Sequence, residues 1–323
     1  MINLQLKIKT NKPNLVDSSV DTYTANIQKL HQKMFDTKDV KTLEWLHDFE
    51  KVIKFLKDNY KSYLSIRNIL NALVVLLLNE DGYNNALISY QNFRDTLNDK
   101  YQKAVETGEM TPKETANWLS LDEINAYIAE MNKQVNNLKL KPGFLNIANL
   151  DLVQTLFLIK FHTVYPLRSE LADTQIVTKK EFNQLSEEDI CNNNYMILSP
   201  NKVTMNIAKY KTRGTYGTRS FTIDDKHVLK YLRNWLKVSP NPKYVLINLK
   251  TEEPLTRLQL TQYFLRIFEE KFNKKISSTM LRKIVVTSKH GKAIRDLDDL
   301  SFVMCHSRQT QATVYNKTPV DVN

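Results

Sequence analysis

Five residues in the second half of the sequence are of the types that attack of a tyrosine on a phosphodiester requires. In chain order they are Arg168, Lys211, Arg282, His306 and Tyr315. A tyrosine hydroxyl, with a pKa of about 10, is a poor nucleophile until cations and a base activate it. Arginine suits the phosphate oxygens, because its planar guanidinium stays charged and grips two oxygens at once. The set therefore predicts attack of Tyr315 on a DNA phosphate.

Each of these residues alone also has an ordinary structural interpretation. Arg168 is followed by Glu170, with which it would form a surface ion pair. Arg282 lies among apolar residues and would need an anionic partner, either an internal carboxylate or a phosphate. His306 follows an apolar stretch, as core histidines do, and Tyr315 would be a helix aromatic with its hydroxyl in water. The presence of all five together favours the catalytic interpretation.

Lys211 is one of four basic residues around a predicted hairpin turn with two glycines. At the tip of a hairpin, Lys211 would donate a proton to a leaving 5′ oxygen. The alternative is a solvated lysine that binds the phosphate backbone. Lys209, Arg213 and Arg219 compete for both roles, and we expect them to contact DNA.

Length, charge and composition restrict the class of protein. The chain has 323 residues, a net charge of +11 and 42% hydrophobic residues, which predicts two folded domains and an anionic partner. Nucleic acid fits better than membrane, because the longest apolar run, residues 72–78, is too short to span a bilayer. We expect no signal peptide, and two cysteines give no disulfide framework. No glycine-rich phosphate loop is present, so the expectation is an intracellular protein that uses no ATP, metal or other cofactor.

The expected fold is mainly α with a small antiparallel β-sheet, divided into two domains. Residues 1–15 are polar and basic and are predicted to form an N-terminal arm. Residues 16–136 are predicted to be a helical domain, with the apolar segment 64–78 as its central helix. Pro142 and Gly143 place a linker at 137–146, before a second domain at 147–323.

The second domain is predicted to combine helices with short strands. Capping boxes start helices at Thr111, Ser120 and Thr256, the first two before the linker. Alternating patterns predict three antiparallel strands. A further strand and two helical segments near the C-terminus are expected. The predicted strands are 195–199, 203–210, 219–223 and 244–249, and the predicted helices are 147–164, 225–237, 278–288 and 296–304.

The second half of the sequence resembles the catalytic domain of tyrosine recombinases, the phage-integrase family. Arg168-Ser-Glu-Leu171 is similar to its first arginine box, and Leu281-Arg282 resembles its second. Met304-Cys-His-Ser307 resembles its Leu-Gly-His-Ser segment, and Tyr315 follows His306 at the family's spacing. Lys211 occupies the hairpin position of the family's catalytic lysine. The resemblance covers residues 147–323, and it extends to the helical half only in architecture, as a core-binding domain for DNA.

The resemblance implies a site-specific recombinase or integrase that cleaves and rejoins DNA without metal or ATP. Tyr315 would form a 3′-phosphotyrosyl intermediate, with Arg168, Arg282 and His306 on the phosphate and Lys211 protonating the leaving oxygen. The expected partner is double-stranded DNA, bound by a homotetramer on paired sites. Within the family, the sequence is most similar in character to the divergent recombinases of eukaryotic mobile elements and large DNA viruses or virophages. Such a protein would act wherever the element's DNA is, in a host nucleus or a viral replication compartment.

Two positions depart from the family's pattern. Thr279 stands where the family usually has a histidine three residues before the second arginine, which leaves the general base open. Ser278 and Thr279 remain candidates for contacting a phosphate oxygen. Cys305 replaces the glycine that usually precedes the histidine.

Other functions remain open at the level of sequence. A type IB topoisomerase uses a similar residue set but rejoins the same strand, and a DNA-binding module would keep the fold without the chemistry. A purely structural helical protein leaves the net charge unexplained. The sequence does not predict the target DNA sequence, the crossover spacing or the direction of the reaction (integration, excision or resolution). In the helical half, the polar residues beside apolar faces are weaker candidates for DNA contact: Arg67, with Lys57, Asn68 and Asn71.

Overall fold

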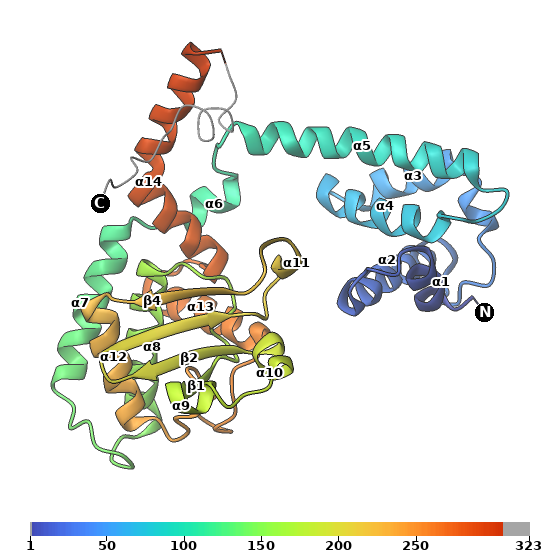
Figure 1. Cartoon of the computed structure of the whole chain (residues 1–323). Coiled ribbons are helices and arrows are strands. Elements are labelled where there is room, and N and C mark those ends of the chain that lie inside the picture. The colour runs from blue at the N-terminus through green and yellow to red at the C-terminus, as the bar shows by residue number, and fades with distance from the viewer. Residues whose placement is uncertain (1, 306–323) are drawn as a thin grey trace, which may run out of the picture. The chain divides into compact units, whose positions relative to one another are not determined.

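The computed structural model describes residues 2–305, and every element below lies in that range. The chain divides into two compact units, Met1–Met110 and Thr111–Asn323, and each is described by itself (Figure 1). Within the described range, no helix is both long and apolar enough to cross a membrane.

The first unit is a helical bundle around α4 (Tyr63–Leu77). This helix is apolar on most faces, with Leu70, Leu73 and Leu76 fully buried, and α1, α2 and α5 pack against it. The prediction of a central helix at 64–78 is therefore confirmed. The other elements of this unit are α1 (Leu4–Asn11), α2 (Asp17–Phe35), the 3-10 turn η1 (Glu44–Leu46), α3 (Phe49–Asn59) and α5 (Asn84–Glu106).

The predicted arm at 1–15 contains a packed helix instead of a free segment. Asn3 caps α1 by accepting a hydrogen bond from the Leu6 amide (3.0 Å). Leu4 and Ile8, one turn apart, are buried in the first unit's core. The apolar residues of this short segment alternate with polar and basic ones without a clear helical period, which is why the sequence suggested an arm.

The second unit surrounds the buried helix α8 (Ile147–Val164) with helices and one four-stranded sheet. Its predicted capping boxes at Thr111, Ser120 and Thr256 are all formed. The other elements are α6 (Pro112–Asn117), α7 (Leu121–Asn136), β1 (Gln175–Thr178), α9 (Lys179–Phe182), α10 (Glu187–Asn192), β2 (Asn194–Ser199), β3 (Lys202–Ile207), α11 (Arg213–Tyr216), β4 (Arg219–Ile223), α12 (Lys226–Val238), α13 (Arg257–Phe272) and α14 (Ser278–Val303).

The boundary between the units follows Met110, which differs from the linker expected at 137–146. The apolar face of α7, including Ile124 and Met131, is buried in the same core as α8. Pro142 and Gly143 form the turn that joins these two helices, with Gly143 at a φ of 72°. A helix–helix turn and an interdomain linker use the same residues, so the sequence signal does not distinguish them.

The sheet has the strand order β1-β2-β3-β4. The three predicted strands pair antiparallel, which confirms that part of the prediction, although β3 ends at Ile207 rather than at residue 210. Strand β1 was not predicted and pairs parallel with β2, so the sheet is mixed. Residues 244–249 were expected to form a strand but make only isolated bridges, at Tyr244 and Ile247.

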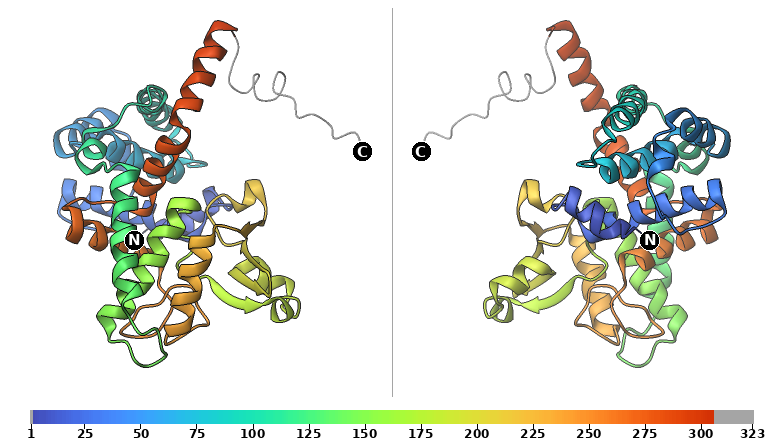
Figure 2. Two further views of the ribbon diagram at one scale, coloured as in Figure 1. Left: turned by 90° about the vertical axis from the view of Figure 1, so that its left-hand side faces the viewer. Right: turned by 90° about the vertical axis from the view of Figure 1, so that its right-hand side faces the viewer.

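Helix α14 is continuous where the sequence suggested two segments, 278–288 and 296–304. Its first turns bury Leu281, Ile284 and Val285 in the second unit's core. Beyond Val285 most of its side chains are exposed, and Figure 2 shows this part extending away from α7 and α8. The continuous helix therefore presents Arg282 close to the core of the second unit.

Candidate active site

Arg168 lies in an exposed turn directly after α8. The helix ends at Val164, two residues before Pro166, which lacks the amide hydrogen that a further turn would need. The turn is fixed by Glu170, whose buried carboxylate accepts a hydrogen bond from the Arg168 backbone amide (2.6 Å). Glu170 thus binds the backbone of Arg168, and no ion pair between the two side chains is formed. The guanidinium of Arg168 remains at the surface.

Arg282 is brought to the same turn by the first part of α14. Its Nε atom donates a hydrogen bond to the Pro166 carbonyl (2.6 Å). Burial lowers the pKa of Arg282, the positive charge of Arg168 lowers it further, and the carboxylate of Glu170 partly opposes both. Two arginines separated by more than a hundred residues are therefore close enough to repel each other.

This pair of guanidinium groups has the electrostatics of an anion site. Among residues 2–305, no carboxylate forms an ion pair with either Arg168 or Arg282. By contrast, Arg266 in the same unit binds both oxygens of Asp151. Like charges held together are unfavourable in the free protein, and a phosphate with two anionic oxygens would relieve the repulsion. Within residues 2–305, the carboxylate that acts on Arg282 is that of Glu170, which raises the pKa of Arg282 without forming an ion pair with it.

His162, which sequence reasoning did not single out, lies behind the two arginines in the last turn of α8. It is 1% exposed, and its Nδ1 atom is 2.9 Å from the Leu158 carbonyl. Burial lowers the pKa of His162 to about 4, and the charge of Arg282 acts in the same direction. The imidazole is therefore neutral near pH 7 and adds no third positive charge. A histidine in the last turn of an apolar helix, six residues before Arg168, was the available signal.

The burial of His162 predicts a pH-dependent stability. The unfolded histidine binds a proton near pH 6.5, whereas the folded one resists protonation down to about pH 4. The contribution of neutral His162 to the free energy of unfolding is thus fully present above pH 6.5. This contribution, at most about 3 kcal/mol, is lost as the pH falls towards 4. We expect urea unfolding of His162→Gln to lack this part of the pH dependence. The control is His227→Gln, which removes an exposed histidine of α12; equal pH profiles for wild type and His162→Gln would contradict the prediction.

Lys211 is exposed in the connection between β3 and β4, which carries the short helix α11 at its tip. The three basic residues that compete with it are engaged. Lys209 pairs with Asp173 (2.5 Å), Arg213 donates to the Cys191 carbonyl (2.5 Å), and Arg219 lies over the Tyr216 ring (5.6 Å). Within residues 2–305, Lys211 forms no hydrogen bond or ion pair. Among the described residues, Lys211 thus has neither a carboxylate nor an aromatic ring as a partner, which leaves its ammonium group available to a substrate.

Of the remaining predicted site positions, some lie within the described residues and two do not. Ser278 is buried and Thr279 is exposed in the first turn of α14, one turn before Arg282, and their contact with a phosphate remains a prediction. Cys305 has a φ of 52°, in the left-handed region that favours glycine, the residue usual here in the resembling family. His306 and Tyr315 lie outside the described residues.

In the first unit, Arg67 is one of four cations that lie over aromatic rings. Its guanidinium lies 4.4 Å from the centre of the Tyr101 ring, and Lys57 lies 5.1 Å from that of Phe93. Such pairs hold long side chains in place while leaving their charge at the surface. We call this set the cation–aromatic pairs: Lys33 with Tyr60, Lys57 with Phe93, Lys100 with Tyr63, and Arg67 with Tyr101.

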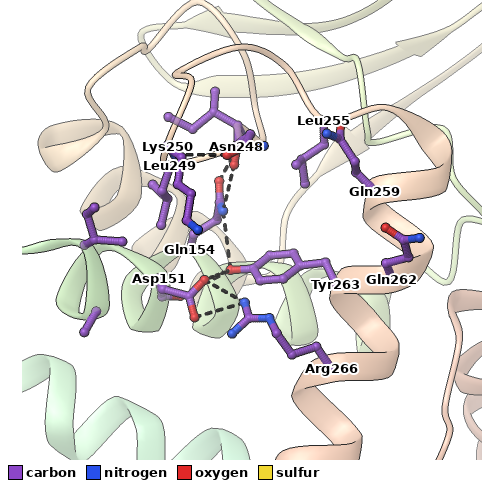
Figure 3. Close-up of a pocket in the computed structure, with 13 residues that line it drawn as sticks. Asp151, Gln154, Asn248, Leu249, Lys250, Leu255, Gln259, Gln262, Tyr263 and Arg266 are labelled. Atoms are coloured by element: carbon purple, nitrogen blue, oxygen red, sulfur yellow. Dashed lines mark hydrogen bonds and ion pairs between the residues drawn. The ribbon is translucent and has the colours of Figure 1, made fainter.

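A pocket of about 960 Å³ opens between the start of α8, residues 247–250 and α13 (Figure 3). Tyr263 donates a hydrogen bond to Asp151 (2.8 Å) and accepts one from Gln154 (3.4 Å), and burial raises its pKa. Arg266 also binds Asp151 (2.9 and 3.1 Å). Asp151, Tyr263 and Arg266 thus bind one another, and none of the predicted site residues lines this pocket.

Comparison with known proteins gives similarity to solved structures only. No protein-family model and no curated protein matches the chain. A post-cleavage complex of the XerH site-specific recombinase with palindromic difH substrate is 15% identical, with a TM-score of 0.47 over 95% of this chain and 88% of that one. A pre-cleavage XerH–difH complex is 16% identical, with a TM-score of 0.47 over 98% and 82%. The function of this chain is therefore inferred from its own residues.

Proposed function

We propose that this chain is a site-specific tyrosine recombinase or integrase that cleaves and rejoins DNA strands through a 3′-phosphotyrosyl intermediate. The observation that carries the proposal is that the fold holds the positive charges of Arg168 and Arg282 close together. The Arg282 pKa is lowered by burial and by Arg168, and neither guanidinium forms an ion pair with a described carboxylate. Two such groups stabilise the charge that develops on the non-bridging oxygens when a phosphodiester becomes pentacoordinate.

The proposed reaction assigns one role to each residue. The Tyr315 oxygen forms a bond to phosphorus while the bond from phosphorus to the 5′ oxygen breaks. Arg168 and Arg282 bind the non-bridging oxygens, together with His306, and the ammonium of Lys211 gives a proton to the leaving oxygen. A 5′ hydroxyl of a second duplex then reverses the attack. Because the phosphotyrosine bond conserves the energy of the phosphodiester, the exchange needs no nucleotide.

A covalent trap tests the proposal directly. The protein is incubated with nicked duplexes from the ends of its own element, so that the cleaved fragment diffuses away, and a denaturing gel reveals protein–DNA adducts. We expect an adduct in which the protein is joined to the 3′ phosphate of the cleaved strand, with a free 5′ hydroxyl on the other fragment. DNA binding without any adduct would overturn the proposal and favour a binding module. Relaxation of a supercoiled plasmid without strand exchange between duplexes would instead indicate a topoisomerase.

The cation–aromatic pairs of the first unit are the proposed contacts with the phosphate backbone, since aromatic rings support their cations and a +11 chain favours DNA. We expect Arg67→Gln to reduce the slope of log K against log salt by about 1, nearly equally for different DNA sequences. Fluorescence anisotropy over a salt series measures this slope. The matched control is Lys7→Gln, which removes the same charge from a lysine already paired with Glu80. Equal slopes for the two variants would contradict this placement.

A further inference from the structure

The buried side chain of Asn194 joins the two segments that carry Arg168 and Lys211. Asn194 is the first residue of β2 and is 1% exposed. Its Nδ2 group donates hydrogen bonds to the Glu170 carbonyl (3.0 Å) and the Lys209 carbonyl (3.2 Å). Its Oδ1 atom accepts from the amides of Ala208 (3.0 Å) and Lys209 (2.8 Å). Both donors and both acceptor positions of the amide are therefore used.

The partners of Asn194 belong to the two parts of the proposed active site. Glu170 is the residue whose carboxylate binds the Arg168 amide, so its backbone is part of the arginine turn. Ala208 and Lys209 begin the connection that carries Lys211 two residues later. A second link follows the same path, because Lys209 pairs with Asp173, just beyond that turn.

An amide makes all four of these bonds at once, and the two carbonyls also accept from Thr174 Oγ1 (2.8 Å) and Arg257 Nη2 (2.7 Å). An aspartate at this position has acceptors alone, so it would keep the two bonds from the amides of residues 208 and 209 and lose both bonds to the carbonyls. It would also place a negative charge against two carbonyl oxygens in a buried site. The change from Asn194 to Asp is almost isosteric, and it therefore cuts the link to the arginine turn while retaining the packing of β2.

We propose that Asn194 is a positioning residue, which holds the Lys211 connection against the Arg168 turn so that proton donor and guanidinium reach the same phosphate. The inference rests on the proposed function. In the cleavage step, the Tyr315 oxygen bonds to phosphorus and loses its proton to solvent, and the 5′ oxygen leaves with the proton from Lys211. Asn194 touches none of the reacting atoms. Its effect comes from the distance between Lys211 and the leaving oxygen.

Asn206 on the neighbouring strand offers a matched control. It lies opposite Tyr195 in the β2–β3 ladder and is 6% exposed. Its Oδ1 atom has one bond, from the Ser220 hydroxyl (3.3 Å), and its Nδ2 group has no partner among the described residues. Asn206→Asp therefore makes the same chemical change in the same sheet without cutting the link between the two segments.

The experiment compares Asn194→Asp with Asn206→Asp on two nicked substrates. One has the ordinary 5′ oxygen at the scissile phosphate, and the other has a bridging 5′ sulfur, which leaves as a thiolate and needs no proton. We expect Asn194→Asp to form the adduct about 100-fold more slowly with the oxygen substrate. Its rate with the sulfur substrate and its DNA affinity should be near those of wild type. Asn206→Asp should stay within about twofold of wild type on both substrates.

Two results of this comparison would overturn the inference. Equal rates for Asn194→Asp and Asn206→Asp would show that the link has no role, and an equal loss on both substrates would show that the position of Lys211 is not what Asn194 controls. Should Asn194→Asp not fold, Asp173→Asn breaks the second link from a partly exposed position. It is expected to show a smaller defect, again confined to the oxygen substrate.

Hydrogen exchange of the free protein separates failure of the inference from failure of the proposed function. We expect Asn194→Asp to accelerate exchange in both 166–174 and 208–218, and Asn206→Asp to leave 166–174 unchanged. Unchanged exchange in Asn194→Asp would refute the link even if the enzyme cleaves DNA. If wild type binds DNA but forms no adduct, the proposed function fails, and the positioning role of Asn194 in that reaction fails with it.

Discussion

Replacement of Tyr315 by phenylalanine is expected to abolish the covalent adduct with nicked DNA. Phenylalanine keeps the aromatic ring and removes the only oxygen that can bond to phosphorus, so the rate should fall by at least about 10⁴-fold. DNA affinity should remain within about twofold of wild type, because phosphate contacts by cations dominate binding. The adduct is measured on a denaturing gel, and peptide mapping of the wild-type adduct identifies the tyrosine.

A tyrosine of the same unit provides the control for Tyr315→Phe. Tyr216 is exposed in the connection that carries Lys211, and its ring lies beside Arg219. Tyr216→Phe removes a hydroxyl from this basic neighbourhood and should leave adduct formation intact. An adduct that persists in Tyr315→Phe and disappears in Tyr216→Phe would move the nucleophile to residue 216 and overturn the assignment made from the sequence.

The sequence offered motifs for the charged residues of the candidate site but none for the parts that position them. Arg168 and Arg282 were recognisable because each lies in a short motif, and the fold brings both to one turn. The role of Glu170 was not recognisable, because a carboxylate two residues from an arginine suggests an ion pair, whereas here it binds a backbone amide. Asn194 has no local signature at all, since its partners lie 14 to 24 residues away.

Local signals also explain which features of the fold were predictable. Capping boxes at Thr111, Ser120 and Thr256 are short-range patterns, and all three formed. The unit boundary depends on which core the apolar face of α7 joins, and that is decided by packing at long range. Strand β1 is only four residues long, and its parallel partner β2 follows an intervening pair of helices, so periodicity alone did not reveal it.

Replacement of Arg282 by alanine is expected to reduce adduct formation by about 10²- to 10³-fold while leaving the fold nearly as stable as before. The rate falls because one preformed donor to the developing phosphate charge is lost. Stability changes by less than about 1 kcal/mol, since loss of the bond to the Pro166 carbonyl is offset by relief of repulsion from Arg168. Adduct kinetics and urea unfolding measure the two effects separately.

Arg266 supplies the opposite case, because it is an arginine of the same unit whose charge is already neutralised. It binds Asp151 and lies near Glu270, and Asp151 also accepts a hydrogen bond from the buried Tyr263 hydroxyl. Arg266→Ala should therefore lower the stability of the second unit slightly, because Asp151 keeps only the hydrogen bond from Tyr263, yet leave the cleavage rate of the folded protein near that of wild type. If Arg282→Ala instead lowers stability and leaves the cleavage rate of the folded protein near that of wild type, as expected for Arg266→Ala, Arg282 is a structural residue. A site built to receive a phosphate requires an arginine whose removal lowers activity but not stability. The counter-charge of such an arginine is supplied by the substrate.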